Sequence, residues 1–456
     1  MRDLTQGSIP RHIVRMAGPI FCSTITFMLW LLVDIYFVAS IGDAAVAGVG
    51  AAGSVTFLVS ALVLVLSAGT LSLIARAAGR KDQPAAVLVL NQSLGLAALC
   101  GTLTLVCGLV FARNYMRSVA ADESVVEAGT TYLRWYSPAM ALQFAAAVLA
   151  SALRATGVVR PTVIIEMSAL VLNIALAPLL IGGWGGHQGL GVAGAGLASS
   201  LAAIANLSLL SAYLLVRGSY ARPAWRQCFP QIEQWKQILM IGLPAAAELT
   251  CTFVYVTVIY YALSKFGAAA QASFGIGSRI LGALQSPAMA IALATGAIAG
   301  QNFGAGNGER VRETFKSAAT ISTVLMVAIT IFVEWKPTLL LSGFTDDPLT
   351  IDLGAIFLQL ISLNLFAQGL IFVSSAMFQG LGNTMPVLVS SGVRLVLYAL
   401  PVLWLSAYPY FRIEHIWYLS IATTALQAIL CLALLHFEFG KRLPPVHKAA
   451  FGRLQV

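Results

Sequence analysis

The sequence predicts an all-α integral membrane protein with twelve transmembrane helices in two parallel six-helix repeats. Of the 456 residues, 59% are hydrophobic and only 10% are charged, and the mean hydropathy is +0.85. Soluble domains have about a quarter charged residues, so this chain has too few charges to cover a soluble globule. Apolar stretches long enough to cross a bilayer recur along the chain, and the chain repeats itself halfway along.

Each expected span is an apolar stretch of about 20 residues or more, bounded by Gly, Pro or charged residues. The long segment between the sixth and seventh spans has the charges, prolines and aromatics of a surface connector. The twelve spans lie near residues 14–38, 46–75, 86–112, 131–153, 161–181, 191–216, 238–264, 269–299, 316–335, 354–379, 385–407 and 414–438.

The positive charges indicate how the chain is oriented in the membrane. With the N-terminus in the cytoplasm, 19 of the 27 Lys and Arg residues lie on the inner side and six on the outer side, while Arg279 and Arg394 lie within spans. The positive-inside rule therefore places both termini in the cytoplasm. These cations are scattered singly, so the net charge of +9 does not indicate a nucleic-acid partner. The partner that the composition requires is the lipid bilayer.

The two halves match at an offset of about 225 residues. For example, 16-MAGP-19 corresponds to 240-MIGLP-244, and 153-LRATGVVRP-161 corresponds to 378-FQGLGNTMP-386. Because six spans is an even number, both halves enter from the same side and are parallel repeats. The expected domains are an N-lobe (1–216), a cytoplasmic connector (217–237), a C-lobe (238–440) and a cytoplasmic C-terminal tail (441–456).

The residues indicate neither a metal nor an organic cofactor. The six cysteines and five histidines are dispersed, without a C-x-x-C or H-E-x-x-H motif. The Gly-rich segment 300-GQNFGAGNG-308 lacks the G-K-[ST] of a phosphate loop. An intramembrane enzyme is disfavoured because the Ser and Cys residues of the spans have no nearby His or paired Asp in the sequence.

Several motifs, taken in order, resemble those of one transporter family. They are 31-LLVDIYFVASIG-42, 152-ALRATGVVRPT-162, 172-LNIALAPLLIGG-183 with 189-GLGVAGAGLAS-199, 242-GLP-244 and 300-GQNFGAGNGER-310. The chain resembles the multidrug and toxic compound extrusion (MATE) family, and within it the DinF-like bacterial branch. The resemblance implies a monomeric transporter of the bacterial inner membrane, with an N-lobe and a C-lobe around a central V-shaped cavity. It also implies export of small organic cations in exchange for protons or sodium.

Asp34 is the first candidate site residue, because a carboxylate within a span usually marks an ion or proton path. It lies about 9 Å from the outer end of the first span at 1.5 Å per residue. Asn173 lies at a similar depth in the fifth span, and Asn173, Tyr36 and Ser199 are candidate hydrogen-bond partners. We therefore expect Asp34 to bind and release the coupling proton.

In the family branch that the chain resembles, the fifth helix has an Asn and, one turn later, a second Asp. This sequence has Asn173 but has Ala177 at the second position. Glu166 lies seven residues before Asn173 and therefore near the same helix face. Two interpretations stay open: Glu166 replaces the missing acid, or it makes a structural contact nearer the cytoplasm.

A second charged group is expected in the C-lobe. Glu248 and Arg394 lie about 15 Å and 13 Å above the starts of their helices, so they are expected to form an ion pair, with Arg279 as the competing partner. A role in cation recognition or coupling is the alternative. The family resemblance places an acid in the tenth helix of sodium-coupled members, where this chain has Gln368, so it favours protons over sodium.

The substrate cavity is expected to have aromatic and methionine side chains, which suit hydrophobic cations, together with a few amides. Sodium-coupled drug antiport and the flipping of lipid-linked saccharides are the alternative functions. The expected lining residues are Met28, Phe37, Gln143, Phe144, Phe253, Tyr255, Met289, Asn364 and Gln368.

Overall fold

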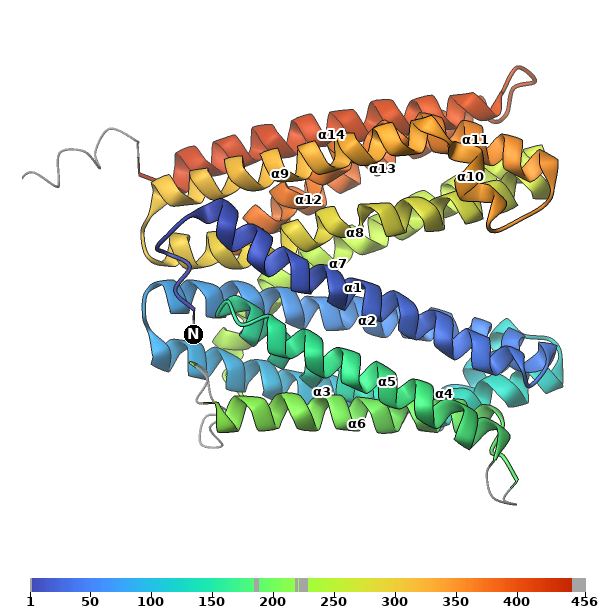
Figure 1. Ribbon diagram of the computed structural model, residues 1–456, viewed down its shortest axis with the longest axis horizontal. Coiled ribbons are helices and arrows are strands. Elements are labelled where there is room, and N and C mark those ends of the chain that lie inside the picture. The colour runs from blue at the N-terminus through green and yellow to red at the C-terminus, as the bar shows by residue number, and fades with distance from the viewer. Residues whose placement is uncertain (1, 184–187, 218–219, 221–228, 445–456) are drawn as a thin grey trace, which may run out of the picture. The chain divides into compact units, whose positions relative to one another are not determined.

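The computed structural model describes residues 2–183, 188–217, 220 and 229–444. Residues 218–219 and 221–228 of the expected connector and residues 445–456 of the expected C-terminal tail lie outside the described residues. Within the described ranges all regular structure is helical (Figure 1). The helices are α1 (Ile9–Ala39), α2 (Asp43–Gly79), α3 (Gln83–Val119), α4 (Glu123–Ala155), α5 (Arg160–Gly182), α6 (Val192–Val216), α7 (Ile232–Leu263), η2 (Ser264–Phe266), α8 (Ala268–Gly304), α9 (Gly308–Trp335), α10 (Pro337–Ser342), α11 (Pro348–Ser362), α12 (Asn364–Leu381), α13 (Met385–Leu405) and α14 (Ile413–Arg442).

The described helices confirm the expected membrane-spanning fold. Eleven of them are long and apolar enough to cross a membrane, and α11 with α12 forms a bent pair that makes a twelfth span. Each expected span falls on one of these helices, with the tenth span divided between α11 and α12. The extra helix α10 is too short to span.

The tenth span is broken because its backbone ladder is interrupted at Leu363. The axes of α11 and α12 differ by 50° there. The hydroxyl of Thr330 on α9 donates a hydrogen bond to the carbonyl of Ser362 at 3.0 Å, and the Ser362 hydroxyl donates to Glu334 at 2.8 Å. Side chains that take over backbone hydrogen bonds are a common cause of a sharp kink.

The chain divides into two compact units. Unit 1 comprises residues 1–3 and 22–242, and unit 2 comprises residues 4–21 and 243–456. These boundaries differ from the expected lobes in two places: the first half of α1 belongs to unit 2, and the first third of α7 belongs to unit 1. The two crossing points lie beside Pro19 and Pro244, at corresponding places in the sequence repeat.

Close backbone packing explains why the start of α7 belongs to unit 1. A Cβ atom at Gly69 of α2 would lie 2.5 Å from the carbonyl oxygen of Ile238, and one at Gly242 would lie 2.0 Å from that of Val65. Only glycine allows so close an approach, as at other crossings of membrane helices. Gly69 of α2 and Gly242 of α7 therefore fix this crossing.

Leu4 explains why the start of the chain belongs to unit 2. Its N–H donates to the side-chain oxygen of Gln301 at 3.0 Å, and its carbonyl accepts a hydrogen bond from the Asn302 amide at 3.2 Å. Arg310 donates to the Gly7 carbonyl at 2.9 Å. The Gly-rich segment 300-GQNFGAGNG-308 thus binds the chain's own N-terminal backbone.

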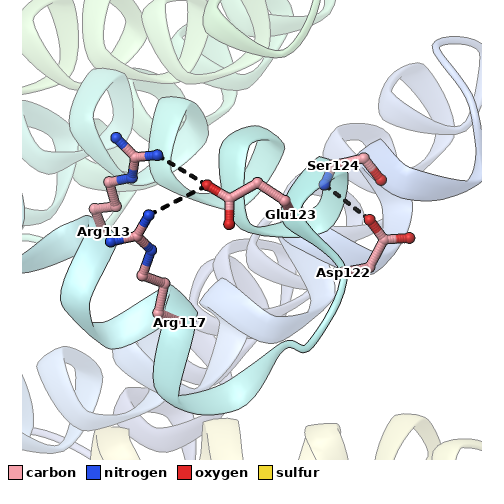
Figure 2. Close-up of polar contacts among 5 residues, drawn as sticks. All are labelled: Arg113, Arg117, Asp122, Glu123 and Ser124. Carbon is pink, nitrogen blue, oxygen red and sulfur yellow. Dashed lines mark hydrogen bonds and ion pairs between the residues drawn. The ribbon is translucent and has the colours of Figure 1, made fainter.

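An exposed charge cluster joins the end of α3 to the start of α4 (Figure 2). Arg113 and Arg117 donate to one oxygen of Glu123 at 2.8 and 3.4 Å, and all three side chains are more than half exposed. Hydrogen bonds from the Ser124 hydroxyl and backbone N–H hold the pKa of Asp122, the residue before α4, below its ordinary value. Exposed ion pairs of this kind contribute little stability.

Candidate functional site

Asp34 lies in a buried polar network within unit 1. It is five residues from the end of α1, and only 8% of its surface is exposed. The hydroxyl of Ser199 on α6 lies 3.3 Å from both carboxylate oxygens of Asp34. The amide of Asn173 on α5 in turn donates to the Ser199 hydroxyl at 2.9 Å. Three helices therefore contribute one side chain each to a continuous chain of hydrogen bonds.

One acceptor in this network has no donor among the described residues. The side-chain oxygen of Asn173 is buried and makes no hydrogen bond, although the Asn173 side chain also interacts with Asp34. A buried acceptor without a donor is unfavourable, at about 1–3 kcal/mol. A protonated Asp34 has an O–H group that could supply the missing donor.

Two further residues near Asp34 differ from what the sequence suggested. Tyr36 is 74% exposed and is not part of the network, so its prediction as a partner is wrong. The reason is helical geometry, because two residues along α1 correspond to about 200° around its axis. Trp30 was not predicted, yet it interacts with Asp34 through its side chain. Its position four residues earlier, on the same helix face, is a signal that could have identified it.

Unit 1 contains a cavity of about 280 Å³ that runs beside this network. Its α4 wall is one helix face, from Tyr136 through a row of alanines to Arg154, and the small side chains of that row leave the space open. The other walls come from α1, α2, α5 and α6. The remaining polar or aromatic lining residues are Ser23, Thr26, Phe27, Trp30, Gln143, Glu166, Ser199 and Asn206.

The predicted lining residues of unit 1 have different surroundings. Gln143 lines this cavity. Phe144 has no exposed surface and is packed in the hydrophobic core, so it is not a lining residue. Phe37 is half-buried and packs against the same core, and Met28 is half-buried outside the set of residues that line the cavity.

The predicted lining residues of unit 2 fall into two groups. The Tyr255 hydroxyl lies 2.7 Å from that of Ser420, which also accepts a hydrogen bond from the Asn364 amide at 3.3 Å. These residues form one polar contact. Phe253 and Met289 are about half exposed, and Gln368 is half-buried.

The expected Glu248–Arg394 pair makes no direct ion contact within 4.0 Å among the described residues, although Arg394 still interacts electrostatically with Glu248. Arg394 lies over the ring of Tyr255, 4.3 Å from its centroid, and donates to Gln427 at 3.2 Å. Glu248 instead accepts a hydrogen bond from Ser375 at 3.5 Å. Two side chains at equal depth on two helices need not meet, and here the Tyr255 ring and the Gln427 amide lie nearer to Arg394. Arg279 is exposed and is not the partner.

Glu166 is separate from the Asp34 network but lines the same cavity. The Ser23 hydroxyl donates a hydrogen bond to its carboxylate. Arg154 lines the cavity too, but it forms no ion pair with Glu166 within 4.0 Å in the described part of the chain. Ala177, at the position of the expected second acid, is 2% exposed and packed in the core.

The described helices form a multi-pass membrane fold, and the family that the sequence matches consists of transporters, not enzymes. Residues 19–179 and 244–405, which cover most of both sequence repeats, match the MatE family model. The chain therefore belongs to the MATE family.

Known relatives cover nearly the whole chain. The FAD transporter of Shewanella oneidensis is 24% identical over 89% of this chain and 90% of its own length. The probable multidrug resistance protein NorM of Thermotoga maritima is 26% identical over 95% of this chain and 93% of its own length. A solved MOP-superfamily transporter from Pyrococcus furiosus shares the fold with a TM-score of 0.88, at 24% identity over 96% of this chain and 97% of the other.

Proposed function

We propose that this protein is a secondary active exporter of amphipathic, cationic organic compounds, driven by exchange for protons at Asp34. The observation on which this rests is the buried Asp34–Ser199–Asn173 network, in which a protonated carboxyl would complete the hydrogen bonds. Family membership and the multidrug names of several relatives support the substrate class.

The proposed cycle depends on different affinities in two conformations. A proton that binds Asp34 from the outer side neutralises the carboxylate and stabilises one conformation of unit 1, in which the cation binds weakly and leaves. Loss of the proton to the cytoplasm restores the carboxylate, and the cation binds again. Only such a difference in affinity between the two states can couple the two fluxes. The positive-inside distribution supports cytoplasmic termini, and the bacterial relatives support the inner membrane of a bacterium as the setting.

Sodium is the second candidate ion. The oxygens of Asp34, the hydroxyl of Ser199 and the free amide oxygen of Asn173 are the hard ligands that such a cation prefers. We favour protons because this network is satisfied by a single added hydrogen, whereas a metal ion requires several further oxygens.

The test is ethidium accumulation in inverted membrane vesicles that contain the protein. With an acidic lumen, wild-type vesicles should accumulate ethidium, and Asp34→Asn vesicles should match vesicles without the protein. Asp43→Asn, which changes an exposed carboxylate at the start of α2, is the matched control and should behave as wild type. Full accumulation with Asp34→Asn, or accumulation driven by a sodium gradient without a pH gradient, would refute proton exchange at Asp34.

A further inference from the structure

The unit 1 cavity is elongated along the second half of α4. Tyr136 and Arg154 both line it from α4, and 18 residues of α-helix between them span about 27 Å. Ser199, which contacts Asp34, lies near the start of α6 at one end, and Glu166 lies near the start of α5 at the other. The cavity therefore runs from Ser199, the contact of Asp34, to Glu166.

The size of this cavity suits water better than a drug. Its volume of about 280 Å³ is below the range of about 300–1,000 Å³ of drug-sized sites, and it is spread over a long path. It has room for several water molecules. Polar groups of Tyr136, Gln143 and Asn206 lie along it and can hydrogen-bond to such waters.

Glu166 and Arg154 both line the cavity but form no direct ion pair within 4.0 Å among the described residues. Glu166 accepts a hydrogen bond from Ser23. The Arg154 Nη2 atom donates to Ser151 at 3.0 Å and to Ser67 at 3.4 Å, while its Nε atom is buried with no acceptor in the described residues. Serine hydroxyls therefore hold each group on its own side of the cavity.

We propose that Glu166 is the inner proton acceptor of this transporter, and that it receives through the unit 1 cavity the proton released by Asp34. The proton leaves the Asp34 carboxyl beside Ser199, water molecules in the cavity carry it along, and the Glu166 carboxylate binds it before release on the cytoplasmic side. Arg154 supplies the positive charge that returns Glu166 to its carboxylate form. This inference rests on the proposed function, because it assumes that Asp34 exchanges protons.

The charged and titratable groups around this path can be named by helix. Asp34 lies on α1, Tyr132, Tyr136 and Arg154 lie on α4, and Glu166 itself lies on α5. The α6 groups that line the cavity, Ser199 and Asn206, do not titrate. A pH dependence assigned to the inner end of the cavity must therefore come from Glu166 beside Arg154.

The test uses the full chain in proteoliposomes that contain a pH-sensitive dye, with ethidium added to drive proton movement. Glu166→Gln keeps the size of the side chain and an acceptor for Ser23, but it cannot bind the proton. We expect it to slow ethidium-coupled proton movement about tenfold or more and to flatten its dependence on cytoplasmic-side pH. Glu166→Asp should restore most of the rate. Glu127→Gln, an exposed residue of α4, is the matched control and should leave the rate unchanged.

A double variant separates a relay from simple charge balance. If Glu166 only balances Arg154, then Glu166→Gln with Arg154→Gln removes both charges and should restore transport. A relay predicts that the double variant stays as slow as Glu166→Gln alone. Wild-type rate and pH profile in Glu166→Gln, or recovery in the double variant, would overturn the inference while leaving Asp34 in its role. Full coupling in Asp34→Asn would instead refute the proposed function.

Discussion

The close crossing of α2 and α7 in unit 1 gives a prediction of lost stability whose size follows from distances in the structure. Adding one methyl group at Gly242 places a Cβ atom 2.0 Å from the Val65 carbonyl oxygen, and adding one at Gly69 places it 2.5 Å from that of Ile238. Both obstacles are backbone atoms, which cannot move aside as a flexible side chain can. Overpacking of this kind costs about 1–3 kcal/mol of stability.

The measurement is the melting temperature of the purified protein in detergent, followed by tryptophan fluorescence. For a unit of this size each kcal/mol lowers the melting temperature by about 2–4 °C, so Gly242→Ala and Gly69→Ala should each lower it by about 3–10 °C. Gly53→Ala is the control on the same helix α2, because nothing lies within 4 Å of its added Cβ. If Gly242→Ala melts at the same temperature as Gly53→Ala, the close crossing does not exist as described.

Three further predictions concern the polar groups. Ser199→Ala removes the hydroxyl between Asp34 and Asn173, so thermal unfolding should show a loss of about 1–3 kcal/mol, and unchanged stability would contradict the network. Glu123→Gln should leave the melting temperature within error, because its ion pairs are exposed, and a clear drop would show that they matter more than their exposure suggests. Asp122→Ala should weaken the start of α4 at neutral pH, measured as faster amide exchange there than in wild type. Because the folded pKa of Asp122 is lowered, the difference in exchange between the two proteins should be full above the ordinary value of 3.8 and should disappear as the pH falls below the folded pKa. A difference in exchange that persists at low pH would contradict this.

The sequence was sufficient for the membrane-spanning helices because their signal is long and local. Each span is an apolar run of about 20 residues, and no packing detail is needed to recognise it. The break at Leu363 was not predictable, since it arises from Thr330 on another helix bonding to the Ser362 carbonyl. The start of α1 belongs to unit 2 and the start of α7 belongs to unit 1. This division also depends on contacts between residues far apart in the sequence, such as that of Leu4 with Gln301.

Only those features of the candidate site that follow from depth in the membrane and from position on a helix face could be predicted from the sequence. Depth in the membrane brought Asp34 and Asn173 together correctly, and the Ser199 hydroxyl joins them. The same reasoning placed Glu248 opposite Arg394, but depth does not determine lateral position, and Arg394 contacts the Tyr255 ring instead. The sequence also could not show which residues of a helix line a cavity.

Asp34 as the site of proton exchange is the central claim, and proton release on substrate binding tests it most directly. Purified protein in weakly buffered detergent is mixed with ethidium, and the released protons are counted with a pH-sensitive dye. Wild-type protein should release protons when ethidium binds, and Asp34→Asn should release none. Equal proton release from the two proteins would contradict the claim.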